Sequence, residues 1–284
     1  MCDGGVFMKT VSPLPIKLCG HSVVLLFLLA FLFSCASVPV TERKSLHLVP
    51  DSEIATMSLD EYNKVLKKSK ISTDTAKVNM VRRVGQRIAA ASEELLKESG
   101  RGADIANYKW EFNLIEDDKT VNAWCMPGGK IAVYTGLLPI TQDDNGLAVV
   151  MSHEVSHAIA KHGNERMSQG LLAQLGAAGL SLALSTSPGV TSDIFMQAYG
   201  VGTQVGFLLP YSRVHEAEAD HIGLILMAKA GYDPHGAITL WQRMSARGGS
   251  RTPEFLSTHP VPESRIRNIE AEIPEAMKYY RARR

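Results

Sequence analysis

Residues 149–163, VVMSHEVSHAIAKHG, form an apolar run that is interrupted by His153, Glu154 and His157. A buried helix normally excludes ionisable side chains, because removing one from water without a partner costs roughly 1 to 3 kcal/mol. Residues four apart on a helix project from the same face, so His153 and His157 can bind one ion together. Glu154 lies beside them on the neighbouring flank. A bound metal ion would therefore explain why this segment tolerates three ionisable side chains.

The spacing is that of the HExxH motif, in which two imidazoles bind Zn²⁺ and the glutamate accepts a proton from the attacking water. A catalytic zinc site usually has a third protein ligand. The best candidate is Glu216, in the predicted helix YSRVHEAEADHIGLILMAKAGYDP (211–234). Asp220 follows on the same helical face and would accept a hydrogen bond from a ligating imidazole. Without the HExxH motif, the two carboxylates would instead indicate the acidic start of a solvated helix.

The N-terminal residues 1–34 differ in composition from the rest of the chain. Two lysines precede an apolar run over 23–33, which is too short to span a bilayer but is typical of a secretory signal. The run ends at LFSC (32–35), which resembles the lipobox of bacterial lipoproteins. We therefore expect residues 1–34 to be a signal peptide and Cys35 to carry lipid. The alternative is an ordinary signal peptide that leaves Cys35 as a free thiol.

The rest of the chain is expected to form one domain over 51–284, preceded by a tether over 35–50. The formal net charge is +1, and the basic residues are dispersed, so the composition does not suggest nucleic-acid binding. If Cys35 carries lipid, Cys125 has no disulfide partner in the mature chain. The core, together with any bound metal, must then stabilise the fold. We expect Cys125 to be a small buried hydrophobe, with a zinc ligand as the alternative.

Hydrophobic spacing predicts amphipathic helices over 52–68 and 73–99. A short β region follows, with candidate strands YKWEFNLIE (108–116) and KIAVYTG (130–136). Most of the chain after Leu137 is expected to be helical. The apolar stretch 170–184 is shorter than a membrane span and predicts a packed helix, with membrane dipping as the alternative. The region 170–207 could form a lid over the site.

The order of motifs resembles family forty-eight of the zinc metallopeptidases, which holds HtpX, the CAAX prenyl proteases, mitochondrial Oma-type proteases and the periplasmic BepA and LoiP proteins. The likeness runs from Ser52 to Ile269. Besides HExxH it covers VNAWCMPGGK (121–130), EAEAD (216–220), STHP (257–260) and Arg265. It implies a mostly α-helical α+β fold of the gluzincin type, with a small β-sheet beside the HExxH helix. It also implies one Zn²⁺ per chain, bound by His153, His157 and Glu216.

The resemblance implies further roles. His259 would donate to the developing oxyanion or occupy the open coordination position, although a bare loop histidine is more often inert. Arg265 would steady that loop or the substrate. The strand 130–136 would be a sheet edge that binds substrate by strand addition, with an ordinary internal strand as the alternative. The substrate-binding residues would be Asn122, Ala123, Gly128, Gly129, Ile131 and Val133. Three other histidines are expected to be structural: His162, His215 and His221.

These features lead us to expect a zinc-dependent endopeptidase with Glu154 and His259 as catalytic residues. Its substrates would be unfolded or misassembled proteins in the cell envelope of a Gram-negative-type bacterium. The protein would be anchored through lipid on Cys35, would face the periplasm from the outer membrane, and could contact envelope assembly machinery. One alternative is a chaperone or assembly factor with a latched zinc site. The other is a structural lipoprotein without metal.

Overall fold

The computed structural model describes residues 35–172, 212–247, 254–259 and 263–281, and Ala36–Arg284 forms one compact unit. The signal peptide expected over 1–34 lies outside the described residues. The same holds, from residue 173 onward, for the apolar stretch 170–184 and the lid expected over 170–207. None of the described helices is both long enough and apolar enough to cross a membrane.

A three-stranded sheet is built from β3 (Glu111–Ile115), β4 (Ala123–Met126) and β5 (Lys130–Tyr134), in the order β3-β5-β4. β3 runs parallel to β5 and β4 runs antiparallel to it. Gly129 lies in the turn between β4 and β5 with a φ of 77°, and a Cβ there would meet the Trp110 ring at 2.6 Å. Glycine is therefore required at this position by both conformation and space.

The central position of β5 corrects the prediction that residues 130–136 form an edge strand. That prediction is wrong because β3 and β4 hydrogen-bond to both sides of β5. Ile131 and Val133 are 1% and 0% exposed and belong to the hydrophobic core, so they offer no surface to a substrate. Among the described strands, β4 is the outer one on the side that contacts helix α5 (Asp144–Ile159).

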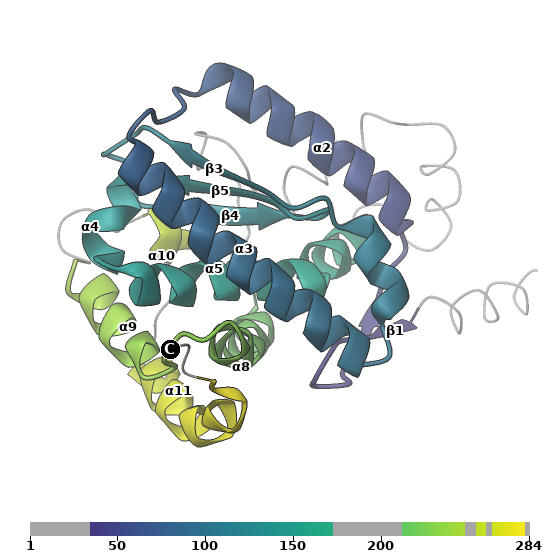
Figure 1. The fold of residues 1–284 in the computed structure, drawn as a ribbon. Helices are drawn as coiled ribbons and strands as arrows, with labels where there is room; N and C mark the ends of the chain where they lie inside the picture. The colour runs from purple at the N-terminus through teal and green to yellow at the C-terminus, as the bar shows by residue number, and fades with distance from the viewer. Residues whose placement is uncertain (1–34, 173–211, 248–253, 260–262, 282–284) are drawn as a thin grey trace, which may run out of the picture. The chain divides into compact units, whose positions relative to one another are not determined.

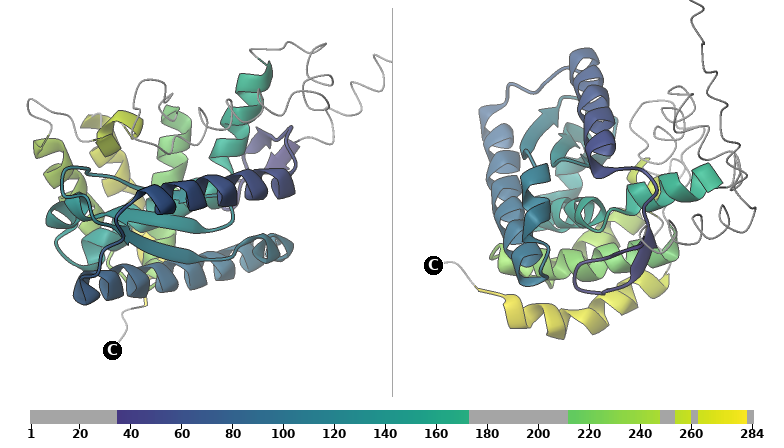
Figure 2. Two further views of the ribbon diagram at one scale, coloured as in Figure 1. Left: turned by 90° about the horizontal axis from the view of Figure 1, so that it is seen from above. Right: turned by 90° about the vertical axis from the view of Figure 1, so that its right-hand side faces the viewer.

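The sheet separates two groups of helices, as the views in Figures 1 and 2 show. Helix α2 (Asp51–Lys68) covers one face, where Tyr62 packs with Trp124 and Ala132. Helices α3 (Thr75–Glu98) and α5 cover the other face, onto which Ile131 and Val133 project. This arrangement confirms the mostly helical α+β fold with a small sheet beside the HExxH helix.

Helix α5 lies at the centre of the helical part, and every residue from 146 to 159 is buried. A helix that is apolar on all sides is expected to be enclosed in this way. Helix α8 (Arg213–Lys229) packs against α5, and a Cβ at Gly223 would lie 3.3 Å from the backbone nitrogen of His153. The glycine thus lets the two helix backbones approach closely at the HExxH motif.

Further helices pack around this pair. α9 (Gly236–Ala246) contacts α5, and α11 (Glu263–Ala276) contacts both α8 and α9. The short elements are η1 (Gly102–Asn107), η2 (Thr135–Leu137), α4 (Leu138–Thr141), α10 (Glu254–Thr258) and η3 (Met277–Tyr279).

The residues that precede α2 are ordered, in contrast to the tether expected over 35–50. β1 (Cys35–Ser37) pairs with β2 (Lys44–Leu46), and Val38 and Val49 are buried. The few apolar residues in this otherwise polar stretch did not form a periodic pattern. From Ala36 onward the stretch belongs to the compact unit Ala36–Arg284, and its Arg43 contacts Glu218 on α8.

Candidate metal centre

The two histidines of the HExxH motif project from α5 as their spacing predicts. The helix begins after Asp143, whose side chain accepts a hydrogen bond of 2.7 Å from the backbone nitrogen of Gly146. His153 and His157 lie further along the helix, one turn apart, and are both buried. Their Nε2 atoms are 3.1 Å apart, so both imidazoles point at one spot.

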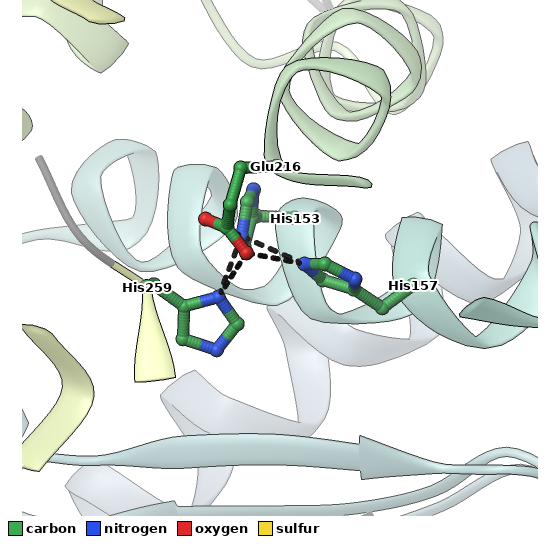
Figure 3. A group of neighbouring side chains, drawn as sticks. All are labelled: His153, His157, Glu216 and His259. Atoms are coloured by element: carbon green, nitrogen blue, oxygen red, sulfur yellow. Dashed lines mark hydrogen bonds and ion pairs between the residues drawn. The ribbon is translucent and has the colours of Figure 1, made fainter. Parts of the chain in front are cut away.

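Glu216 and His259 converge on the same spot from other elements (Figure 3). Glu216 lies in the first turn of α8, and its Oε1 is 3.4 Å from His157 Nε2. His259 directly follows α10, and its Nδ1 lies 2.9 Å from Glu216 Oε1 and 3.2 Å from His153 Nε2. The structure therefore brings together the predicted ligand set and adds His259 to it.

The geometry of this group fits a metal ion. One ligand atom from each of His153, His157, Glu216 and His259 lies within 4.8 Å of the other three. A tetrahedron with corners 2.0–2.1 Å from its centre, as in zinc sites, has edges of about 3.3–3.4 Å. The contacts of 2.9 to 3.4 Å described above are close to that length. The residues present thus match the size and chemistry of a tetrahedral zinc site.

The electrostatic surroundings also favour a cation. Burial lowers the pKa of His153, but the carboxylates of Asp220 and Glu216 outweigh this effect and raise the pKa to about 9. Burial would raise the pKa of Glu216, but the neighbouring histidines hold that pKa well below its usual range. Negative charge that stabilises an imidazolium also stabilises a divalent ion at the same place.

Glu154 lies beside the group without being one of its four members. It is 5% exposed, and its Oε1 has no hydrogen-bond partner among the described residues. His259 Nε2 lies 3.4 Å from that oxygen. Burial raises the pKa of Glu154, although the charges of His259 and His153 oppose the shift. A buried carboxylate with a raised pKa and a free oxygen is suited to accept a proton.

Asp220 and Arg265 lie behind His153. The Oδ1 of Asp220 is 3.0 Å from His153 Nδ1, so Asp220 can accept the proton of the nitrogen that faces away from the group. Arg265 donates to both oxygens of Asp220 at 2.7 and 2.8 Å, and its Nη1 lies 2.8 Å from Glu216 Oε2. Its guanidinium also lies over the ring of Trp241, 3.8 Å from the ring centroid.

His162 supports His157 in a comparable way, although its sequence position suggested only a structural role. Its Nδ1 lies 2.8 Å from His157 Nδ1, and its Nε2 lies 2.9 Å from Glu218 Oε2. Lys161 adopts a φ of 58° directly after α5, and this left-handed residue turns the chain so that the next side chain faces back. Helical spacing, which was the only available signal, does not extend past such a break.

The other predicted residues lie nearby but outside the group. Asn122 and Ala123 are buried at the start of β4, and Gly128 and Gly129 form the turn after it. Cys125 is a half-buried free thiol whose pKa is raised by burial and, to a lesser extent, by the charge of Glu154. Two histidines make ion-pair contacts with carboxylates: His215 with Glu165 at 3.1 Å and His221 with Glu272 at 3.7 Å.

A buried HExxH helix that meets a glutamate from a later helix is the metal centre of a metallopeptidase. Comparison with known families agrees, because the family described as "Peptidase family M48" matches residues 82–273. That match covers more than half of the chain. The protein therefore belongs to peptidase family M48.

Several characterised relatives are similar to this chain. The mitochondrial metalloendopeptidase OMA1 of Schizosaccharomyces pombe is 35% identical over 84% of this chain and 66% of its own length. The human metalloendopeptidase OMA1 is 31% identical over 89% of this chain and 49% of its own length. The β-barrel assembly-enhancing protease of Escherichia coli is 32% identical over 58% of this chain and 34% of its own length. The matched part thus spans between about a third and two thirds of the length of these relatives.

Proposed function

We propose that the protein is a zinc-dependent endopeptidase. The observation that carries this proposal is the convergence of His153, His157 and Glu216 on one spot, with the buried carboxylate of Glu154 beside it. The names of the relatives support the proposal, because they are called metalloendopeptidases or proteases.

The reaction would be hydrolysis of a peptide bond. When bound, zinc would lower the pKa of the attacking water toward about 7 and would polarise the scissile carbonyl. Glu154 accepts the proton of the water and later delivers it to the leaving amine, for which its Oε1 has no competing hydrogen bond among the described residues. Asp220 and His162 orient His153 and His157 from the outside.

The substrate would lie in extended form beside β4 and not beside β5. β4 is one of the two outer strands of the described sheet, and it contacts α5. Cys125 on this strand is close enough to Glu154 for the carboxylate to influence the pKa of the thiol. A chain added to β4 would be held by main-chain hydrogen bonds, which give shallow sequence selectivity. That mode of binding suits unfolded or misassembled proteins as substrates.

His259 would occupy the fourth coordination position in the resting protein. Its Nδ1 lies 3.2 Å from His153 Nε2 and 2.9 Å from Glu216 Oε1, which is the spacing expected of atoms that share one metal ion. A closed site also supports a second candidate function, namely a chaperone or assembly factor that holds unfolded proteins while the zinc remains latched. The two functions predict different results when His259 is removed: increased cleavage for the peptidase and no cleavage for the chaperone.

The location proposed from the sequence is the cell envelope of a Gram-negative-type bacterium, with a lipid anchor on Cys35 facing the periplasm, and with the outer membrane favoured. The apolar run that ends at Cys35 supports this location, as does the similarity to an E. coli protease that is named for β-barrel assembly. Metabolic labelling with a radioactive fatty acid should mark the wild-type protein and not Cys35→Ser. A wild-type protein without label would overturn the lipid anchor.

The function is tested by incubating the full-length chain with casein and measuring fragments and bound zinc together. We expect cleavage, about one zinc per chain, loss of cleavage after chelation, and recovery when zinc is added back. A folded protein without zinc would contradict the metal site and favour a structural lipoprotein. A zinc-loaded protein that never cuts would leave the chaperone as the better description.

Replacing His259 by alanine is expected to increase casein cleavage, because the fourth position would become permanently open. The increase would be on the order of ten-fold if the latched state holds about nine molecules in ten. His221→Ala is a matched control, because His221 lies on α8 and contacts Glu272 instead of the metal group. A fall in cleavage would show that His259 assists the reaction. If neither the wild type nor His259→Ala cleaves casein, the chaperone function is favoured.

A further inference from the structure

A second buried polar cluster adjoins the metal centre on the side of His157. It runs from His157 through His162 to Glu218 and ends at Arg43 in the hairpin between β1 and β2. Arg43 Nε donates to Glu218 Oε2 at 2.9 Å, and Nη2 of the same guanidinium lies 2.8 Å from that oxygen. The hydroxyl of Thr41 donates to the other oxygen of Glu218. The hairpin thus holds both oxygens of this carboxylate.

The guanidinium of Arg43 also binds a second carboxylate, that of Glu165, with hydrogen bonds of 2.9 and 2.7 Å. Glu218 and Glu165 are both buried. Two buried carboxylates that share one cation lose their compensation together when it is removed, and like charges at this distance repel each other. From the side of the hairpin, Arg43 and Thr41 therefore hold the Glu218 carboxylate in place, while His162 contacts it from the side of the metal centre.

The direction of the hydrogen bonds follows from the role of His157. If Nε2 of His157 binds a metal, its proton must lie on Nδ1, which faces His162 Nδ1 at 2.8 Å. His162 must then accept at Nδ1 and carry its own proton on Nε2, from which it donates to Glu218 at 2.9 Å. Glu218 Oε2 is the acceptor that this tautomer of His162 requires.

The hairpin is built to hold Arg43 at this position. The backbone nitrogen of Val38 donates to the carbonyl of Arg43 at 2.9 Å, and that of Glu42 donates to the carbonyl of Val38 at 3.0 Å. Val38 is 2% exposed and packs into the main hydrophobic core. The hairpin is therefore anchored on the domain independently of the contacts made by the guanidinium.

We propose that Arg43 is a positioning residue for the metal centre, which acts through Glu218 and His162 to fix the tautomer and orientation of His157. The N-terminal hairpin would then be part of the apparatus that binds the metal, although it supplies no ligand. This inference rests on the zinc site of the proposed function. It does not depend on peptide hydrolysis, because its test measures metal binding alone.

The test measures zinc affinity of the full-length chain by competition with a chromophoric chelator. Loss of an outer partner of a ligating histidine typically weakens metal binding about 10- to 100-fold. Because Arg43 acts two steps further out, behind His162 and Glu218, we expect Arg43→Gln to weaken zinc binding about ten-fold, at the lower end of that range. Arg83→Gln is the matched control. Arg83 makes a similar contact through two hydrogen bonds, of 2.8 and 2.7 Å, with Asp144 on α5, the helix that carries His157. That control should retain wild-type affinity.

A double-mutant cycle separates positioning from a general loss of structure. In a His162→Gln background, Arg43→Gln should weaken zinc binding further by less than about two-fold, because the connection to His157 is already broken. An equal loss from Arg43→Gln in both backgrounds would overturn the proposal, and so would wild-type affinity in a folded Arg43→Gln protein. If Arg43→Gln does not fold, Thr41→Val and Glu218→Gln replace it. Unchanged affinity in both of these variants would likewise overturn the proposal.

Discussion

Replacing Glu154 by glutamine is expected to lower the turnover of casein by a factor on the order of 10² to 10⁴, which is the usual contribution of a general acid and base. Bound zinc should stay at the wild-type level, because Glu154 is not one of the four residues whose ligand atoms converge. Glutamine has nearly the same shape as glutamate but cannot accept the proton. The measurement is turnover and zinc content on the same preparation.

Glu116→Gln provides the control for this experiment. Glu116 is an exposed glutamate that pairs with Lys70 at the surface, so the same chemical change there should leave turnover unaltered. If Glu154→Gln loses zinc together with activity, Glu154 is a ligand and the assignment of the site must change. If the variant cuts as fast as the wild type, another group takes the proton.

Replacing Arg265 by glutamine is expected to destabilise the metal-free protein by about 3–5 kcal/mol, the usual cost of removing one partner from a buried ion pair. Arg265 is 5% exposed and contacts the carboxylates of Asp220 and Glu216. Both of these groups would be left buried with reduced compensation. Urea unfolding of wild type and variant, both in the presence of a chelator, measures the difference in free energy of unfolding.

The destabilisation should depend on pH. Burial would raise the pKa of Asp220, but the charge of Arg265 and the contact with His153 outweigh burial and lower the pKa. A carboxyl whose pKa is lowered on folding adds stability above its ordinary pKa of about 4, and this stability is lost as the pH falls through the lowered value. The gap between wild type and variant should therefore narrow in acid.

Arg83→Gln is the control for Arg265→Gln. It removes an exposed ion pair and should change the free energy of unfolding little. A loss from Arg265→Gln that is no larger than that of the control would mean that Asp220 and Glu216 find other partners. A gap that stays constant from neutral to acid pH would mean that the loss comes from packing on Trp241 instead.

Local periodicity was sufficient to predict those parts of the protein whose partners lie within a turn or two of helix. The helices predicted over 52–68 and 73–99 correspond to α2 and α3, because each buries one apolar stripe. His153 and His157 meet for the same reason. Glu216 was found through chemistry, since a zinc site needs a third ligand, and the spacing on α8 then indicated Asp220 behind it.

Pairing between distant segments could not be predicted in this way. Residues 130–136 contain the residue types that favour a strand, but this composition does not reveal how many neighbours a strand has. In the structure, β3 and β4 pair with the two sides of β5, which was expected to be an edge. Arg43 reaches Glu218 across 175 positions of the chain. No periodic signal connects residues so far apart, and the short polar hairpin that carries Arg43 shows none of its own.

The packing of Gly223 against His153 has a mechanical consequence for the four converging residues. Where two helix backbones touch, neither can slide without disturbing the core on both sides, so His153, His157 and Glu216 form a stiff frame. His259 instead follows the five-residue helix α10, which a backbone hydrogen bond of 3.1 Å from Phe255 to Val121 ties to the start of β4. A displacement of His259 would involve this short helix, whereas a displacement of His153, His157 or Glu216 would involve the long helices α5 and α8. Three of the four converging residues thus lie on long, closely packed helices, and the fourth directly follows a helix of five residues.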